Sequence, residues 1–429
     1  MKLLILSLLI FTSTLFGFTN DKITMEWLEK QPRSFAKDFY IWRYLNKNIT
    51  SEESNKALSQ VRYLNNKLFN TITLLSALFT PTLVSAFYDR NSFAAIPDKV
   101  TNNAVTQVSI ESEDYLLSFS GLGEKRTYHY VHNKAYAYSV KKKKWQKISP
   151  VPLSSDNRKL TNNLVGRLAS VATAIKDKAY IFGGYTVAKD HTEVSVADVY
   201  SYALHTDSYQ LLAPMPVPVD DSVALTYQQK YIYLVNGWHN SGNVNLVQLY
   251  NSQTNQWQQA TPFPGKPVFG HAGGIVGNKI VICDGVAIEV HENSKRSYQD
   301  EVSCYLGIID QKQPSKIDWR MIKHPTNNAR YRMAALGIEN KQQIAFIGGS
   351  ENPYNYNGIG YNGKPSQPSD EIWLYDLKQQ KWQIGRSKTA TMDHRGLLLL
   401  NNELLTLGGM AVDQQVLNTV NFYPLINEK

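Results

Sequence analysis

Residues 179–184 read AYIFGG, a short apolar strand that ends on two glycines, and the pattern recurs five more times along the chain. The other copies are YLLSFSG (115–121), YIYLVNG (231–237), IVICDG (280–285), IAFIGG (344–349) and LLTLGG (404–409). Their final glycines lie 48 to 64 residues apart. A repeat of this length indicates a ring of stacked units, because one four-stranded sheet cannot bury both of its faces alone.

Further strands predicted around each glycine strand complete a four-stranded unit. An apolar run precedes it, as in ASVATAI, and an aromatic strand follows it, as in DVYSYAL. A fourth strand then carries a large aromatic residue, which in successive units is Trp145, Tyr209, Trp257, Trp319 and Trp382. Glycine lets the inner strands approach closely around an axis, and the aromatic residues fill the wider part of each wedge. The sequence therefore predicts an all-β fold, a six-bladed β-propeller.

The sixth unit ends after NFYPL near the C-terminus and lacks a fourth strand. Residues 91–99, NSFAAIPDK, have an aromatic residue and a proline in fourth-strand order. We predict that this segment is an N-terminal strand that closes the ring, because closure removes the exposed edge that an open sheet would leave. An unclosed array of five and a half blades is the alternative.

Residues 91–425 resemble a kelch-type propeller, and the phase of the repeat makes the resemblance more specific. The segment from Ile96-Pro97 to Ala104-Val105 is similar to the cyclically permuted mutarotase family, a rearranged relative of the periplasmic N-acetylneuraminate epimerase. The resemblance implies an isomerase that accelerates anomer interconversion of an acidic sugar such as N-acetylneuraminate without a cofactor. The chain departs from the pattern at Val286, where the epimerase relatives place a glutamate just after the blade glycine.

The first 88 residues differ from the repeat array and indicate export. Residues 1–19 have one lysine and then an apolar run, as in a secretory signal. Residues 20–68 contain apolar residues at helical spacing, and 23–68 resemble the N-terminal region of soluble lytic transglycosylases of Campylobacterota. Residues 69–88 are a second apolar, signal-like segment, and residues 89–429 form the propeller. The stretch before the propeller is either a fused leader or a purposeful helical domain.

The composition agrees with a periplasmic or secreted protein. Cys283 and Cys304 fall in consecutive strands of one unit, where they either form a disulfide or remain as buried thiols. The net charge is +9, but the one basic run, Lys141–Lys144, lies at a predicted turn, so we expect no nucleic-acid partner. We also expect no stable membrane span after signal removal. No His-x-x-x-His or Cys-x-x-Cys spacing indicates a zinc site.

Two sets of loops are predicted to open on the same face, namely those between second and third strands and those that connect successive blades. A mutarotase needs a base for the anomeric hydroxyl, an acid for the ring oxygen and a pocket for the sugar. The candidate acids and bases in these loops are Asp284, Glu289, His271 and His394. The candidates for substrate binding, in which arginine suits a sugar carboxylate, are Arg126, Arg167, Asp221, His239, Arg330, Arg332, Asn355, Asp393 and Arg395.

Other functions stay open at this level. Any single arginine of this set is expected to hold a loop carbonyl rather than a ligand, whereas the set as a whole favours a small-ligand pocket. A non-catalytic propeller that binds a glycan or protein partner through the same face is favoured by Val286, since the expected glutamate is missing. Cell-wall glycan cleavage rests on residues 23–68 alone.

Overall fold

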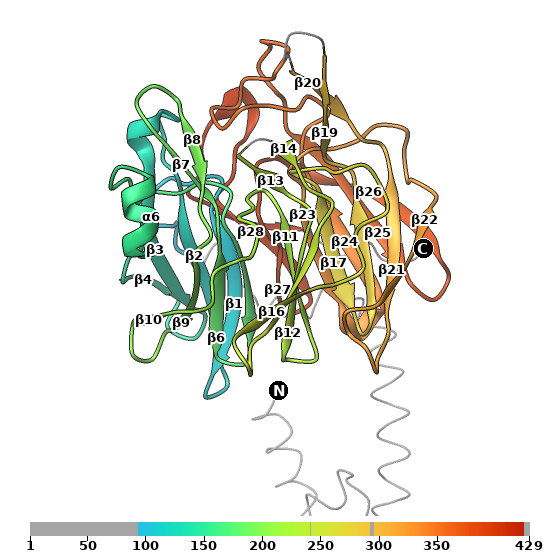
Figure 1. Cartoon of the computed structure of the whole chain (residues 1–429), viewed down its shortest axis with the longest axis horizontal. Helices are drawn as coiled ribbons and strands as arrows, with labels where there is room; N and C mark the ends of the chain where they lie inside the picture. Colours follow the sequence, from blue (N-terminus) through green and yellow to red (C-terminus); the bar gives the residue numbers. More distant parts are fainter. Residues whose placement is uncertain (1–92, 241, 292–295, 424–429) are drawn as a thin grey trace, which may run out of the picture. The chain divides into compact units, whose positions relative to one another are not determined.

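The computed structural model describes residues 93–240, 242–291 and 296–423, and these residues form a six-bladed β-propeller (Figure 1). Each of the first five blades is a four-stranded antiparallel sheet, and the sixth has three strands within the described residues. The predicted all-β, six-bladed architecture is confirmed. The expected signal segments and the helical segment before the propeller lie outside the described residues.

The blades follow one another in chain order. Blade 1 contains β1 (Ala104–Ile110), β2 (Glu113–Leu122), β3 (Val131–Ser139) and β4 (Lys144–Ile148). Blade 2 contains β5 (Val171–Ile175), β6 (Lys178–Phe182), β9 (Val199–Ala203) and β10 (Ser208–Leu211). Blade 3 contains β11 (Val223–Tyr227), β12 (Tyr231–Val235), β15 (Val247–Asn251) and β16 (Gln256–Gln259).

The remaining blades repeat this order. Blade 4 contains β17 (Ala272–Val276), β18 (Lys279–Cys283), β21 (Cys304–Ile309) and β22 (Ile317–Ile322). Blade 5 contains β23 (Ala334–Ile338), β24 (Gln343–Ile347), β25 (Ser369–Asp376) and β26 (Lys381–Thr391). Blade 6 contains β27 (Leu398–Leu400), β28 (Glu403–Leu407) and β29 (Val420–Tyr423).

Three of the loops between second and third strands fold into small hairpins, which lie toward the top of Figure 1. They are β7 (Tyr185–Val187) with β8 (Glu193–Ser195), β13 (Trp238–His239) with β14 (Gly242–Asn243), and β19 (Val286–Val290) with β20 (Arg296–Asp300). Helical structure in the described chain is limited to α6 (Ser155–Leu160) and the 3₁₀ turns η2 (Tyr128–Tyr130), η4 (Glu339–Lys341) and η5 (Val412–Gln414). No helix in this part of the chain has the length and apolar character needed to span a membrane.

The small-residue pairs of the repeat have a conformational cause. The first residue of each pair has φ between 52° and 69°, a left-handed region that Asn and Asp tolerate. The second residue is always glycine, with φ between 84° and 122°. At Gly184 a Cβ atom would lie 2.2 Å from Ser170 Oγ, so no larger residue fits there without a shift. The residue after the glycine then bridges to the preceding inter-blade loop, as Tyr185 does to Leu168.

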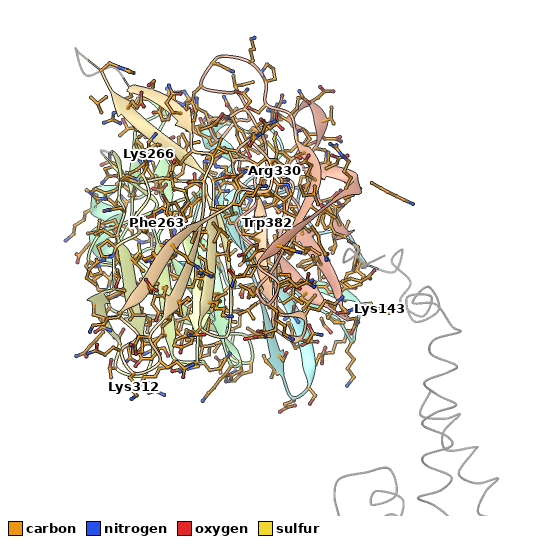
Figure 2. The ribbon with its side chains drawn as sticks, turned by 90° about the vertical axis from the view of Figure 1, so that its right-hand side faces the viewer. Lys143, Phe263, Lys266, Lys312, Arg330 and Trp382 are labelled. Atoms are coloured by element: carbon orange, nitrogen blue, oxygen red, sulfur yellow. A yellow bond between two sulfur atoms is a disulfide. The ribbon has the colours of Figure 1, made fainter. Side chains whose placement is uncertain are left out.

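The hydrophobic core lies between neighbouring blades. One cluster joins Tyr233 and Leu249 of blade 3 to Ile280 and Ile317 of blade 4, and equivalent clusters join the other consecutive pairs from blade 1 to blade 6. In Figure 2, Trp382 lies on the body of the propeller, and its Nε1 donates to the Lys323 carbonyl at 2.7 Å across the blade boundary. Each wedge is therefore both packed and hydrogen-bonded.

An N-terminal segment joins blade 6 to blade 1. The Ile96 N–H donates to the Asn418 carbonyl at 2.7 Å, and Trp145 Nε1 of blade 1 donates to the Ala94 carbonyl at 2.8 Å. The Phe93 ring packs against both Tyr138 and Phe422. Residues 93–99 are not a regular strand, however, and this corrects the predicted strand at 91–99. In blade 2 the equivalent hydrogen bond is made by the Met215 N–H to the Ala197 carbonyl, and Met215 comes after the fourth strand, β10, has ended. The segment around Ile96 therefore corresponds to the residues that follow a fourth strand.

Cys283 and Cys304 lie directly opposite each other in β18 and β21 and form a disulfide. This outcome decides between the two possibilities that the sequence left open. The basic run at Lys141–Lys144 is exposed at the turn between β3 and β4, as predicted, and Lys143 marks it in Figure 2.

Candidate functional site

Six residues, one from each inter-blade loop, form a closed ring around the propeller axis. All have φ between 49° and 68°, and they are Asn102, Ala169, Asp221, Gly270, Arg332 and Asp393. Backbone N–H groups of Asp221, Gly270 and Arg332 donate to the carbonyl of the preceding member at 3.1, 2.9 and 2.7 Å. The Asn102 N–H donates to the Asp393 carbonyl at 3.2 Å, and the Asn102 side chain accepts from the Ala169 N–H. We call these six residues the axial ring.

The ring carries a buried network of two arginines and two aspartates. Arg332 contacts Asp221 through Nε at 3.2 Å and through Nη2, and contacts Asp393 Oδ1 through Nη1 at 3.2 Å. Arg395 Nη2 lies 2.8 Å from Asp221 Oδ1 and 3.5 Å from Asp393 Oδ1. Burial alone would raise the pKa of Asp221, but the two guanidinium groups outweigh it and hold that pKa below its ordinary value. Both arginines are therefore already neutralised by carboxylates of the protein.

Arg167 and Arg330 take equivalent places two residues before the ring and turn into the blades. Arg167 donates to the Pro152 carbonyl at 2.9 Å and to the Gly183 carbonyl at 3.4 Å. Arg330 donates to the Gly348 carbonyl at 2.6 Å, and its guanidinium lies 3.7 Å from the centre of the Trp373 ring. The structure therefore places these two arginines against backbone carbonyls, away from the axis.

Asp284 is enclosed in blade 4. Its Oδ1 lies 2.7 Å from His324 Nε2, and its Oδ2 accepts from the Arg330 N–H at 2.8 Å. Burial raises the pKa of Asp284, an effect that His324 opposes. Cys304 lies near the same pair and would complete a set of three possible metal ligands, but its sulfur is bonded to Cys283.

His271 and His394 lie beside the ring and are buried. Burial lowers the pKa of His271 to about 4 and that of His394 to about 3, so both rings are neutral near pH 7. His271 Nε2 donates to the Val235 carbonyl at 2.9 Å, and His394 Nε2 shares a hydrogen bond of 2.6 Å with Thr391 Oγ1.

The other candidates lie in the loops above the ring. Glu289 is exposed on β19. Arg126 donates to the Asn357 carbonyl at 2.5 Å, and the His239 ring hydrogen-bonds to the Pro218 carbonyl at 2.8 Å. Asn355 lines a small cleft directly above the ring. Of the residues named from sequence, the structure thus brings Asp221, Arg332, Asp393 and Arg395 together at the axis, with Asn355 nearby. Their roles remain predictions.

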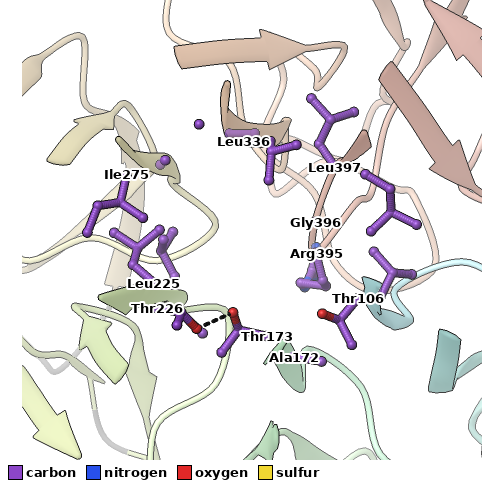
Figure 3. Close-up of a pocket in the computed structure, with 18 of the residues that line it drawn as sticks. Thr106, Ala172, Thr173, Leu225, Thr226, Ile275, Leu336, Arg395, Gly396 and Leu397 are labelled. Atoms are coloured by element: carbon purple, nitrogen blue, oxygen red, sulfur yellow. Dashed lines mark hydrogen bonds between the residues drawn. The ribbon is translucent and has the colours of Figure 1, made fainter. Parts of the chain in front are cut away.

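Two cavities meet the ring from opposite sides, and Asp221 lines both of them. The axial channel has a volume of about 510 Å³ and runs along the first strands of the blades. Figure 3 shows its walls, with side chains such as Leu225, Ile275 and Leu336 and a hydrogen bond of 2.8 Å between Thr173 and Thr226. The channel lining is mostly apolar and carries its ionisable side chains mainly at the two ends.

The second cavity, the loop-face cleft, has a volume of about 50 Å³ and a lining of a different kind. Aromatic rings share it with Glu193, Asp220 and Arg332, and these rings belong to Tyr185, Trp238, Phe269, Tyr298, Tyr356 and Tyr361. Phe269 packs edge-on against Tyr298 and lies 5.5 Å from the Trp238 ring centre. The rings close off water around a few ionisable groups, which is the environment in which pKa values shift most.

Two carboxyl groups in this cleft have a raised pKa. Although Glu193 is exposed as a residue, loss of water around its carboxyl group raises its pKa to about 7, and Arg332 opposes this rise while Asp221 adds to it. The Glu193 carboxyl group has no hydrogen-bond partner within the described residues. Asp220 is buried and accepts from Ser195 Oγ at 2.6 Å. Burial and then the neighbouring Asp221 raise the pKa of Asp220 well above its ordinary value.

Sequence reasoning did not select Glu193 or Asp220. Asp220 precedes the ring residue Asp221 in the chain. The structure is needed to show that Asp220 contacts Ser195 whereas Asp221 contacts Arg332. Glu193 is the first residue of β8. Because β8 pairs with β7 in a hairpin that folds back over the ring, Glu193 lines the loop-face cleft. The available signal was the acidic end of the loop GYTVAKDHTE between the second and third strands of blade 2.

Comparisons with known proteins agree with this architecture. No family model matches the chain. Kelch-like protein 15 from Homo sapiens is 21% identical over 278 residues, which are 62% of this chain and 40% of that protein. Kelch-like protein 26 from Danio rerio is 23% identical over 192 residues, 45% of this chain and 29% of that protein. The solved structure of YjhT aligns with 79% of this chain and 98% of its own, with a TM-score of 0.59 and 16% identity.

The fold is a kelch-type β-propeller. The chain spans about 40% of the length of the first curated relatives it matches, so the activities and partners of those proteins do not transfer with the fold. None of the relatives named above is a lytic transglycosylase, and the resemblance of residues 23–68 finds no support in them. A propeller is the fold that the mutarotase resemblance implies, while the activity itself is a separate question.

Proposed function

We propose that this protein is a sugar mutarotase that acts in the loop-face cleft. The observation that carries the proposal is that Glu193 and Asp220 share one small cleft and that both have a raised pKa, which for Glu193 is about 7. Carboxyl groups whose pKa is raised by burial in a cleft are candidates for the general acid and base of an active site. The sequence resemblance to the permuted mutarotase family supports the same chemistry.

The reaction needs only proton transfer at two oxygens of the sugar. The Glu193 carboxylate takes the proton of the anomeric hydroxyl, and protonated Asp220 donates to the ring oxygen as the bond between that oxygen and the anomeric carbon breaks. The open-chain carbonyl compound rotates and closes from the other face, and both protons return. A base with a pKa of about 7 is well matched to this task near neutral pH.

Glu193 replaces the carboxylate that the resemblance leads one to expect after the blade-4 glycine. Val286 at that position is fully buried and packs with Phe269 and Tyr331. Its backbone bridges to Phe269 at the rim of the cleft. In this proposal the carboxylate comes from the β7–β8 hairpin of blade 2, and Val286 packs behind Phe269, which lines the cleft.

We also propose that the protein works outside the cytoplasm, in the periplasm or as a secreted protein. The Cys283–Cys304 disulfide supports this, since such bonds persist in oxidising compartments. N-terminal sequencing of the exported protein tests it. A start near residue 87 or near residue 18 supports export, and an intact Met1 in a purely cytoplasmic fraction contradicts it.

The activity is tested by NMR of anomer exchange in freshly dissolved sugars, with N-acetylneuraminate and neutral hexoses compared. We expect Glu193→Gln and Asp220→Asn each to slow the catalysed exchange at least 100-fold, the lower range for loss of general acid–base catalysis. Glu111→Gln, at the exposed turn between β1 and β2, is the matched control and should retain full activity. Glu289→Gln distinguishes Glu193 from Glu289 as the base: the variant should retain activity if the base is Glu193 and lose it if the base is Glu289. An exchange rate that the protein leaves unchanged for every sugar rejects the proposal.

A binding propeller without catalysis is the second candidate, and the Kelch-like relatives together with the aromatic lining of the cleft favour it. On this hypothesis the loop face binds a glycan or protein partner. Ligand binding would then survive Glu193→Gln with unchanged affinity, and no sugar would exchange its anomers faster.

A further inference from the structure

A third cavity, which we call the outer pocket, adjoins the loop-face cleft and shares a wall with it. The outer pocket has a volume of about 440 Å³ and is lined by Asp300, Glu351, Asn352, Asn362 and Lys364 together with two tyrosines. Those tyrosines, Tyr298 and Tyr361, also line the cleft. Their rings are stacked with centres 3.7 Å apart and an interplanar angle of 6°. The two cavities are therefore neighbouring parts of one surface, divided by a rigid aromatic wall.

The sizes of the cavities indicate how a ligand would occupy them. Pockets for small ligands have volumes of about 300–1,000 Å³, and the cleft with its 50 Å³ is well below that range. The cleft therefore admits the anomeric edge of a sugar and leaves the rest of the molecule outside. The outer pocket lies within the range, so it has room for what the cleft excludes.

The charge of the combined lining opposes an anionic ligand. Among the described residues, the lining carries the carboxyl groups of Glu193, Asp221, Asp300 and Glu351, and also Asp220, whose pKa is raised; its cationic groups there are those of Arg332 and Lys364. Arg332 is already paired with two aspartates. Arg126 and Arg296 do not line either cavity, and the Arg296 guanidinium lies over the Trp238 ring, 5.6 Å from its centre. A sugar carboxylate would therefore enter a region of net negative charge without a free guanidinium to receive it.

The polar groups of the outer pocket suit sugar hydroxyls. Asn362 Nδ2 donates to Asn352 Oδ1 at 2.8 Å, and Asn352 Nδ2 donates to the Lys364 carbonyl at 3.2 Å, so the two amides are held in place by the loop. Loss of water, Asp284 and Glu351 raise the pKa of Asp300 to about 6, which leaves it mostly ionised at pH 7.5 as a strong acceptor for hydroxyl groups.

We propose that the ligand is a neutral oligosaccharide, with its reducing-end sugar entering the loop-face cleft and its next sugar in the outer pocket. This rests on the proposed function only for the position of the reducing end. The wall of Tyr298 and Tyr361 gives the apolar surface that the C–H groups of a sugar need, and Asp300 and Glu351 accept from its hydroxyls. An acidic monosaccharide would be repelled by the negative charge of this surface and would be too small to occupy both cavities.

The test measures affinity by NMR titration at pH 7.5 for cellobiose and N,N′-diacetylchitobiose, for the monosaccharides glucose and N-acetylglucosamine, and for N-acetylneuraminate. At least one disaccharide should bind about tenfold more tightly than its monosaccharide, the factor expected from one hydrogen bond to a charged group. N-Acetylneuraminate should bind no more tightly than the monosaccharides. Equal affinity of mono- and disaccharides, tighter binding of N-acetylneuraminate, or no binding of either disaccharide overturns the inference.

Substitutions locate the second sugar. Asp300→Lys should abolish the advantage of the disaccharide and leave monosaccharide affinity unchanged, and that unchanged affinity also reports a folded protein. Asp318→Asn, an exposed aspartate on β22, is the matched control and should change neither. If the disaccharide binds through Asp300 and no sugar exchanges faster, the mutarotase activity fails and this inference stands. If N-acetylneuraminate exchanges faster and Asp300→Lys has no effect on any ligand, the inference fails and the activity stands.

Discussion

Replacing Arg332 with glutamine is expected to destabilise the propeller strongly, because it leaves charged aspartates inside the protein. The Arg332 side chain is 2% exposed, and its guanidinium contacts both Asp221 and Asp393. Removing one partner of a buried ion pair costs about 3–5 kcal/mol. Arg395 keeps its contact with Asp221 at 2.8 Å in the variant, so we expect the lower end, a loss of about 3 kcal/mol in the free energy of unfolding.

Urea unfolding followed by tryptophan fluorescence measures this loss, and Arg386→Gln is the matched control. Arg386 pairs with Asp370 at 2.7 Å but is 67% exposed, and surface pairs contribute less than about 1 kcal/mol. The two arginines make ion pairs of similar length and differ in burial, so burial alone should separate the variants. Equal losses would refute the argument that the axial ring is held by a desolvated charge network.

The same substitution has a second readout in the cleft. Arg332 lowers the pKa of Glu193 below the value that loss of water alone would give. Without this guanidinium the pKa should rise above 7, and the pH at which anomer exchange reaches half its maximum should rise with it. A profile that stays at the wild-type pH would show that Glu193 does not sense Arg332.

Four further predictions concern single sites. Anomer exchange should increase as pH rises through about 7 and Glu193 loses its proton, and Glu193→Gln should remove this step from the pH–rate profile. Asp220 binds its proton more tightly when folded, so its burial costs stability above the ordinary pKa of about 3.9; Asp220→Asn should be more stable than wild type at pH 8 and equal to it at pH 3 in urea unfolding. Gly184→Ala should lower the midpoint of thermal unfolding, because its Cβ would clash with Ser170 Oγ at a φ of 86°. Cys283→Ser, compared under oxidising and reducing conditions, should lose about 3 kcal/mol of stability only against the oxidised wild type, since a bridge across 21 residues constrains the unfolded chain.

The repeat could be predicted from sequence because its cause is local. Two successive residues with positive φ, of which the second has a value that only glycine adopts readily, leave a mark in every blade, as at Asp284-Gly285 and Gly348-Gly349. The aromatic residues of the fourth strands are visible for the same reason, since each must fill one wedge. The predicted strand at 91–99 was wrong because a proline in this repeat comes after the fourth strand has ended, so Pro97 marks the residues that follow a strand and not the strand itself.

The site was harder to predict because side-chain roles there depend on neighbours from other blades. Arg330 and Arg332 are two residues apart, yet Arg330 turns to the Gly348 carbonyl and Arg332 to Asp221. Asp220 and Asp221 are adjacent, yet one has a raised pKa and the other a lowered one. The chain turns at the axial ring, where Asp221 and Arg332 have φ of 49° and 56°, so neighbouring side chains point in different directions, and sequence alone does not tell which of them faces the axis.

Under the proposed function, the charge network of the ring explains why the base is Glu193 and not one of the ring aspartates. Asp221 and Asp393 are paired with Arg332 and Arg395, and Asp221 is a poor base because the two guanidinium groups hold its pKa below the ordinary value. Glu193 stands in a separate hairpin, so its carboxyl group can be desolvated without breaking the ring. If the proposed function holds, the axis is kept by paired charges and the chemistry is done by a carboxylate from a loop, so the substrate could change through that loop while the propeller stays intact.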